Sequence, residues 1–186
     1  MNLLQNLLKS FLSLAQNILI VFQKSKRDAV VSDQRSQEPE FLPDEGHILR
    51  YVKPSAIDDG VIGGGAFLGR YVGDDPSVNW VECFPGVLNN QISEIRKKSR
   101  ITYAATGRLA RLNIGKTRSH VSEKTNNEHN LNVIKDALEA NNNYEEDPSH
   151  ALMKGVLSVD DIYGEFVGDL IAECIIDSFP AVAKNE

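Results

Sequence analysis

The amino-acid sequence predicts an α+β fold: a single domain with a small, irregular, mostly antiparallel sheet, covered by a C-terminal helix. Short apolar segments bounded by glycine and proline recur between residues 46 and 180, which is typical of strands joined by turns. A long apolar run at helical spacing follows residue 158. A separate amphipathic helix is expected before the domain. The expected organisation is a helix at 1–25, a flexible linker at 26–45, the α+β domain at 46–180 and a tail at 181–186.

Residues 2–25 predict the N-terminal helix, because Leu, Ile and Phe recur every three or four positions along one stripe. Polar residues interrupt every turn, so no transmembrane segment is expected, and no signal-peptide cleavage site follows. Three roles stay open: packing on the chain's own domain, self-association or docking on a protein partner, and contact with a membrane surface. The polar face is rich in Asn, Gln and Ser rather than Lys and Arg, which disfavours the membrane.

Composition limits the class of protein. The chain has 186 residues, a net charge of −6 and a hydrophobic content of 41%, so it can bury a core but is not a general coater of nucleic acid. Cys83 and Cys174 form no CxxC pair and lie in apolar surroundings. The histidines show no metal-ligand spacing. We therefore expect no metal site and no cofactor, and a cytoplasmic location.

Within the domain, HILRYV at 47–52 predicts a strand bounded by Gly46 and Pro54. Alternation then places His47, Leu49 and Tyr51 on one face and Ile48, Arg50 and Val52 on the other. The next expected elements are a strand at 61–72 with glycines at its start, an apolar segment at 78–84, a helix at 87–98, one bent strand or two strands at 101–114, a polar loop at 117–130, a strand or helix at 131–138, and a strand at 151–157.

The C-terminal helix is expected to span 158–178. Ser158 is a good N-cap, and apolar residues repeat at helical spacing up to Pro180. Gly164 and Gly168 lie four apart inside this helix. They either allow another element to approach closely or are simply tolerated.

Two glycine-containing segments imitate nucleotide-binding motifs. GVIGGGAFLG lacks the strand–GxGxxG–helix context of a dinucleotide site. ARLNIGKT ends like a P-loop, but Ala110 replaces the first glycine and no helical pattern is evident after it. Both nucleotide motifs are therefore rejected.

A basic segment is the better candidate for binding. Eight basic residues fall within 96–118 of an otherwise acidic chain, which favours an anionic partner such as RNA, DNA, a nucleotide or an acidic protein. The alternative is a solvated face balanced by the acidic C-terminal half. The eight are Arg96, Lys97, Lys98, Arg100, Arg108, Arg111, Lys116 and Arg118.

Acid–base chemistry has three candidate residues. His47 and His150 could serve as base and acid, because imidazole titrates near neutrality, and Arg50 offers a planar fork suited to phosphate. Strand alternation separates His47 from Arg50, however, and the alternative is a purely structural role for all three.

The RY pair at 50–51, SVNW at 77–80 and PSHA at 148–151 together resemble a family of small uncharacterised bacterial proteins over about 46–180. This resemblance implies no established activity. It does imply which positions deserve testing: His47, Arg50, Tyr51, Ser77, Asn79, Trp80, Ser149 and His150.

The leading expectation is a binding or assembly module that contacts an anionic partner through 96–118. The alternative is a metal-independent enzyme acting on nucleic acid or nucleotide phosphates through His47, Arg50 and His150.

Overall fold

The structure is a computed structural model, and it describes residues 38–183. The chain divides into two units, Met1–Glu38 and Pro39–Glu186. The helix expected at 1–25, most of the expected linker and residues 184–186 of the tail lie outside the described residues. The roles expected of that helix therefore stay predictions. Among the described helices, none is long and apolar enough to cross a membrane.

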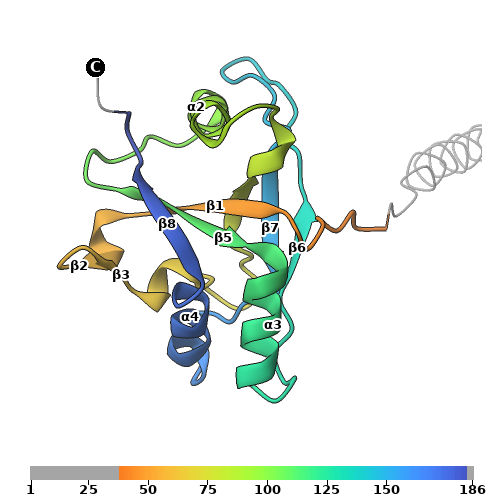
Figure 1. Cartoon of the computed structure of the whole chain (residues 1–186), viewed down its shortest axis with the longest axis vertical. Coiled ribbons are helices and arrows are strands. Elements are labelled where there is room, and N and C mark those ends of the chain that lie inside the picture. Colours follow the sequence, from red (N-terminus) through yellow and green to blue (C-terminus); the bar gives the residue numbers. More distant parts are fainter. Residues whose placement is uncertain (1–37, 184–186) are drawn as a thin grey trace, which may run out of the picture. The chain divides into compact units, whose positions relative to one another are not determined.

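Six strands form one antiparallel sheet in the order β6-β7-β4-β1-β5-β8 (Figure 1), which confirms the α+β prediction. A separate hairpin joins β2 (Ile57–Asp58) and β3 (Val61–Ile62). The strands of the sheet are β1 (His47–Val52), β4 (Ser77–Trp80), β5 (Arg108–Asn113), β6 (Asn132–Lys135), β7 (His150–Lys154) and β8 (Ile175–Pro180).

The two neighbours of β1 pair with it very differently. β5 pairs along its whole length, from His47 opposite Asn113 to Val52 opposite Arg108. β4 pairs only where Ile48 faces Trp80 and Leu49 faces Asn79. The second half of β1 therefore has no strand partner on its β4 side.

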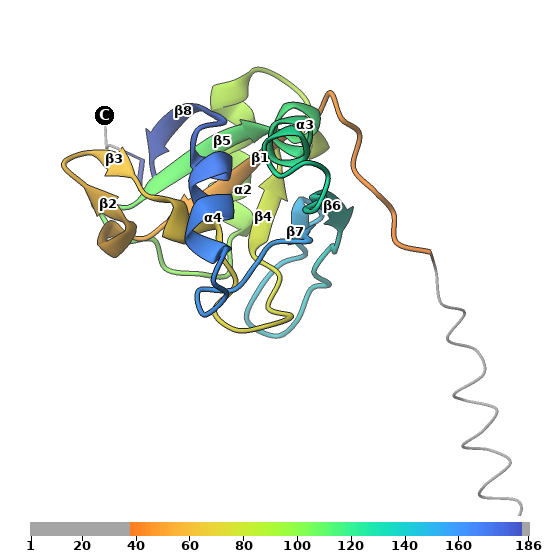
Figure 2. The same ribbon diagram turned by 90° about the horizontal axis from the view of Figure 1, so that it is seen from below.

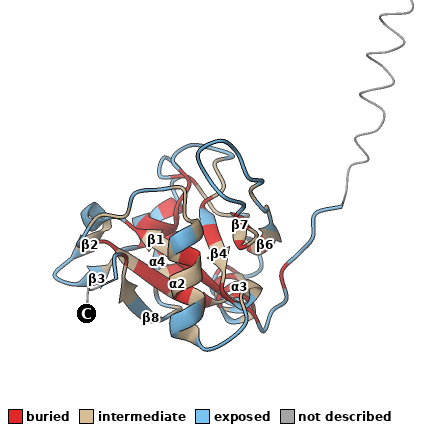
Figure 3. Cartoon of the chain, turned by 90° about the horizontal axis from the view of Figure 1, so that it is seen from above, coloured by how far each residue is buried: buried red, intermediate tan, exposed pale blue. Residues whose placement is uncertain are grey.

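Helices cover both faces of the sheet. On one face, Ile48 and Val52 belong to a core closed by α3 (Ile114–Lys124) and α4 (Gly164–Ala172). On the other, Leu49 and Leu109 pack with apolar residues of α2 (Leu88–Lys98). Figure 1 shows α2 on one side of β1 and β5 with α3 and α4 on the other, and Figure 2 shows α3 and α4 from below. In Figure 3 the buried residues lie along the strands between these layers. The predicted alternation along β1 is confirmed.

The prediction of one helix over 158–178 is wrong. α4 spans only Gly164–Ala172, and the chain then forms the edge strand β8 beside β5. Ile162 and Phe166, which had the spacing of core residues, are 90% and 50% exposed. The segment IIDSFP instead satisfies the free edge of β5, where Phe179 faces Leu109.

The expected loop at 117–130 is also wrong, because α3 occupies its first half. Asn113 caps this helix through its side-chain oxygen, which accepts from the Lys116 amide at 2.9 Å. Ile114, Thr117 and Val121 are its buried residues. Threonine at a buried position concealed the helical period, and its hydroxyl is satisfied by the Asn113 carbonyl at 2.8 Å.

Three further segments differ from expectation. The strand predicted at 61–72 ends at Ile62 and is followed by a 3₁₀ turn, η2 (Gly64–Phe67). In 101–114 only Arg108–Asn113 is a strand. For 131–138, where strand and helix were both open, the structure has a strand. The chain also joins the sheet before Gly46, because the Leu42 amide donates to Val133 at 2.9 Å and the Leu42 side chain is buried.

Glycines allow α4 to lie directly on η2. A β-carbon on Gly168 would lie 2.6 Å from the Gly64 carbonyl oxygen, and one on Gly64 would lie 2.4 Å from the Asp169 amide nitrogen. Of the two interpretations of the helix glycines, close approach is therefore the correct one at Gly168.

Candidate functional site

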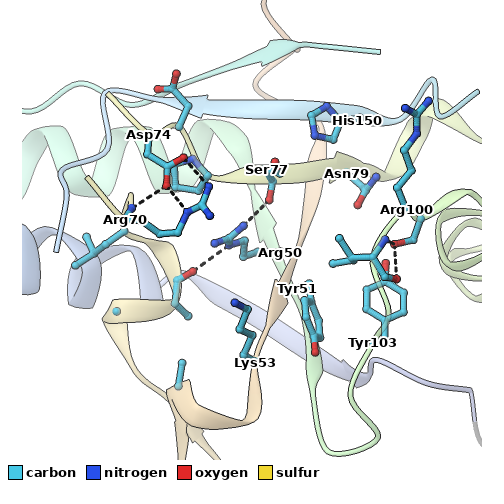
Figure 4. A pocket seen from close by; sticks show the side chains of 18 of the residues that line it. Arg50, Tyr51, Lys53, Arg70, Asp74, Ser77, Asn79, Arg100, Tyr103 and His150 are labelled. Carbon is cyan, nitrogen blue, oxygen red and sulfur yellow. Dashed lines mark hydrogen bonds and ion pairs between the residues drawn. The ribbon is translucent and has the colours of Figure 1, made fainter. Parts of the chain in front are cut away.

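A pocket of about 480 Å³ lies where β1 and β4 stop pairing (Figure 4). It collects five of the eight positions that the family resemblance singled out, although they come from three strands separated by up to a hundred residues of sequence. Those five are Arg50, Tyr51, Ser77, Asn79 and His150. Three further cations line it: Lys53, Arg70 and Arg100.

Arg50 lies near the centre of Figure 4 and is held by backbone carbonyls. Its Nε donates to Ala66 at 2.9 Å and its Nη1 donates to Ser77 at 2.8 Å. The second bond reaches β4 beyond the last β1–β4 backbone pair. Burial lowers the pKa of the Arg50 guanidinium, and the Asp74 carboxylate partly offsets this effect.

One nitrogen of Arg50 stays available. Nη2 makes no hydrogen bond to the described residues, and it is not among their buried unpaired polar atoms. Within residues 38–183, no carboxylate lies within ion-pair distance of this guanidinium. Arg50 is therefore a half-buried cation that forms no ion pair with the described residues.

Lys53 and Arg100 resemble Arg50 in having no carboxylate ion pair in the part of the chain that the structure describes. Arg100 donates to the backbone carbonyl of Glu139, and its guanidinium lies 5.8 Å from the ring centre of Tyr144. Arg70 differs, because its Nε lies 2.9 Å from Asp74. Three of the four cations that line the pocket thus lack a carboxylate ion pair among the described residues.

The carboxylates of the pocket are already engaged. Asp74 pairs with Arg70, and Asp75 pairs with Lys154. Asp147 is buried and accepts from the Ser149 hydroxyl at 2.6 Å. These bonds leave the unpaired cations to set the sign of the charge that the pocket attracts.

Ser149 supports the pocket rather than lining it. The residue is fully buried, so its hydroxyl cannot serve as a nucleophile toward a ligand. It accepts from Asn79 Nδ2 at 2.9 Å, and the same nitrogen lies 3.2 Å from Asp147 Oδ2. Both contacts orient the Asn79 amide, whose oxygen makes no side-chain hydrogen bond in the part of the chain that the structure describes.

Two tyrosines form an aromatic wall. Tyr51 and Tyr103 lie with ring centres 4.9 Å apart at 60°, and the Tyr51 hydroxyl accepts from the Ala104 amide at 2.9 Å. Burial raises the pKa of the Tyr103 phenol. Gly107 leaves room for the Tyr51 ring, since a β-carbon there would lie 2.7 Å from it. Tyr51 is therefore a packed wall residue.

The structure separates the two histidines that were expected to act together. His150 lines the pocket, and its Nδ1 lies 2.8 Å from the Asp136 carbonyl oxygen and 3.1 Å from the Asp136 carboxylate. His47 does not line the pocket, and its Nδ1 lies 2.7 Å from Glu82. Trp80 lies outside as well, partly buried against the core. The expected His47–His150 pair is therefore not formed.

The basic segment at 96–118 does not form one surface. Its residues are divided between α2 on one face of the sheet, β5 within it and α3 on the other face. Four of the eight side chains pair with carboxylates, and Arg96 donates to backbone carbonyls. Of the eight, Arg100 alone lines the pocket. The four pairs are Lys97–Glu94, Lys98–Glu145, Arg111–Asp177 and Arg118–Asp44, whereas Arg108 and Lys116 have no ion pair in the described part.

A helix does follow the P-loop-like segment, contrary to expectation, but it offers no phosphate site. The first-turn amides of α3 already donate within the chain: Ile114 to Gly46 at 3.0 Å and Gly115 to Asp44 at 2.9 Å. A β-carbon on Gly115 would lie 2.8 Å from Asp44, so this glycine serves packing. The amides that would bind a phosphate in a P-loop are therefore already occupied in this chain.

Sequence reasoning missed Lys53, Arg70 and Asp136. Lys53 directly follows the RY strand and was a natural candidate, whereas the other two reach the site only through tertiary folding. Among residues 38–183, no group of three or more His, Cys, Asp or Glu side chains is placed to hold a metal ion. Comparison of the chain with protein-family models, curated proteins and solved structures finds no match.

Proposed function

We propose that the domain is a binding module for a phosphate-bearing ligand of nucleotide size, held in the pocket beside β1 and β4. The observation that carries this proposal is Arg50, a half-buried guanidinium without a carboxylate ion pair in the described chain. Removing a cation from water is costly unless a charge of opposite sign compensates for it. A bound anion would supply that compensation.

The same sheet contains an arginine with a structural role, which makes the contrast clear. Arg111 on β5 meets Asp177 with two bonds, at 2.9 Å from Nε and 2.7 Å from Nη2. Arg50 has two backbone carbonyls in place of such a carboxylate. These carbonyls fix the plane of its guanidinium without neutralising its charge, and the nearest acidic influence, Asp74, is paired with Arg70. This arrangement suits a group that recognises an anion.

The ligand class follows from charge and size. Arg50, Lys53 and Arg100 line one pocket and form no carboxylate ion pair within residues 38–183, which favours a ligand with more than one negative charge. A volume of about 480 Å³ lies within the range of small-molecule sites. A nucleotide, or the phosphorylated end of an RNA chain, meets both conditions.

The test is calorimetric titration of the full chain with ADP and with inorganic pyrophosphate at low ionic strength. The variant Arg50→Met keeps the side-chain length and removes the charge, so we expect its affinity to fall at least about tenfold, as one lost charged hydrogen bond implies. Arg118→Met removes a cation outside the pocket and should leave affinity unchanged. Binding of neither ligand by the wild-type chain, or equal binding by Arg50→Met, would overturn the proposal.

A further inference from the structure

We propose that the ligand held at Arg50 is a mononucleotide, and that its nucleoside lies in a second hollow beside the β2–β3 hairpin. The inference rests on the proposed phosphate site and adds the position and the chemical class of the rest of the ligand. This second space, the hairpin hollow, suits an uncharged organic group and disfavours a further phosphate. A mononucleotide therefore fits the two spaces together better than the phosphorylated end of an RNA chain.

The hairpin hollow is continuous with the pocket. It has a volume of about 660 Å³, and it shares three wall residues with the pocket, which are Ser55, Ala56 and Gly65. Gly65 is exposed, and a β-carbon on it would meet nothing within 4 Å. No side chain separates the two spaces at this position, so one ligand can extend from the pocket into the hollow.

The hairpin hollow also lies on the same face of the sheet as Arg50. On β1, Arg50 alternates with Ile48 and Val52, which belong to the core closed by α3 and α4. Ala56 and Ile57, two wall residues of the hollow, pack against that same core. Figure 1 shows β2 and β3 on the side of β1 that carries α4.

Hydrogen bonds connect the Arg50 guanidinium to the wall of the hollow. Arg50 Nε donates to the Ala66 carbonyl at 2.9 Å, and the Ala66 amide donates to the Gly63 carbonyl at 3.1 Å. The Gly63 amide in turn donates to the Ala56 carbonyl at 3.0 Å, and both of these residues line the hollow. The guanidinium and the hollow are therefore held in a fixed relation, which lowers the cost of binding a ligand that contacts both.

The two spaces differ in charge. Arg50 and Lys53 line the pocket, whereas the side chains that line the hollow include two carboxylates, Asp58 and Asp59, and no cation among the described residues. Both carboxylates are exposed and form no ion pair within residues 38–183. They repel a phosphate and so direct the charged end of the ligand to Arg50. Because a carboxylate accepts hydrogen bonds, the hydroxyl groups of a ribose suit it instead.

An apolar surface lies in the hollow beside these carboxylates. Val61 lines the hollow and is 69% exposed, although it belongs to strand β3. Ile57 and the bare backbone of Gly63 line it as well. A nucleobase that packs on this surface removes it from water, which is favourable.

The first measurement is the backbone amide spectrum of the full wild-type chain, titrated with ADP and with inorganic pyrophosphate. Both ligands should move the Gly65 amide signal, and only ADP should also move those of Val61 and Gly63. Gly115, which packs against Asp44 and lines neither space, is the control. If ADP moves only the signals that pyrophosphate moves, the inference is wrong and the proposed binding function stands. If neither ligand binds, both are wrong.

The second measurement compares the affinities for ADP and pyrophosphate by calorimetry. Val61→Ser should lower the ratio of ADP affinity to pyrophosphate affinity about fivefold, as the loss of one or two buried methyl groups implies. Val72→Ser is the matched control, because Val72 is 87% exposed and lines neither space, and it should leave the ratio unchanged. An unchanged ratio in Val61→Ser would refute the position of the nucleoside.

The third measurement tests the ligand class. AMP should bind the wild-type chain more tightly than the dinucleotide pApA, because the second phosphate of pApA would approach Asp58 and Asp59. Equal or tighter binding of pApA would overturn the assignment to a mononucleotide while leaving the phosphate site at Arg50 in place.

Discussion

Replacing Gly168 by alanine tests how the fold builds the site. The new β-carbon would lie 2.6 Å from the Gly64 carbonyl oxygen, whereas ordinary contacts begin at 3.4 Å. The obstacle is backbone, so α4 and η2 have to separate. Overpacking of this kind costs about 3 kcal/mol, and alanine regains about 1 kcal/mol of helix propensity. We expect a net loss of ~2 kcal/mol in the free energy of unfolding.

The same change should reach the ligand pocket. η2 begins at Gly64 and carries Ala66, whose carbonyl accepts the 2.9 Å bond from Arg50 Nε. When η2 moves away from α4, this bond weakens and the guanidinium loses its fixed plane. Gly168→Ala should therefore also weaken pyrophosphate binding, although the residue does not line the pocket.

The assay is urea and thermal unfolding of the full chain. For a chain of this length the melting temperature should fall by about 6 °C, since 1 kcal/mol corresponds to roughly 2–4 °C. Gly65→Ala is the matched control, because a β-carbon there meets nothing within 4 Å, and its stability should stay within about 0.5 kcal/mol of the wild type. A Gly168→Ala chain as stable as this control would refute the packing argument.

Two further predictions concern buried polar groups and thiols. Ser149→Ala removes the 2.6 Å donor to the buried Asp147 carboxylate, so unfolding in urea should show a loss of about 2 kcal/mol; unchanged stability would mean that Asp147 is satisfied otherwise. Burial raises the pKa of the Cys83 and Cys174 thiols, which favours the neutral form in the folded state. Their contribution to stability is therefore present below the unfolded-state pKa and declines as pH rises through the folded-state pKa. Iodoacetamide at pH 8 should modify the folded chain more slowly than the unfolded chain, and equal rates would contradict this.

Local pattern predicted some elements and concealed others. HILRYV gave a correct strand because its alternation matches a sheet with a core on each face. β8 was concealed because its residues continue the apolar run of α4 without a proline or glycine between them, and only the free edge of β5 decides that they form a strand. Ile162 was expected in the core by spacing and is 90% exposed.

The site was predictable only in part. Arg50 and His150 were chosen for their chemistry, and β4 brings them to one pocket by pairing with β1 on one side and β7 on the other. No spacing rule predicts that β1 and β4 part after Leu49, which is what creates the pocket. The residues of the basic segment are close in sequence, but α2, β5 and α3 carry them to different faces of the sheet. A sequence count of basic residues cannot show this separation.

The most direct test of the central claim is a crystal structure of the full chain with ADP. The account predicts that a phosphate oxygen lies within hydrogen-bond distance of Arg50 Nη2, with the guanidinium still bound to the carbonyls of Ala66 and Ser77. ADP bound elsewhere, with Arg50 Nη2 facing only water, would contradict it.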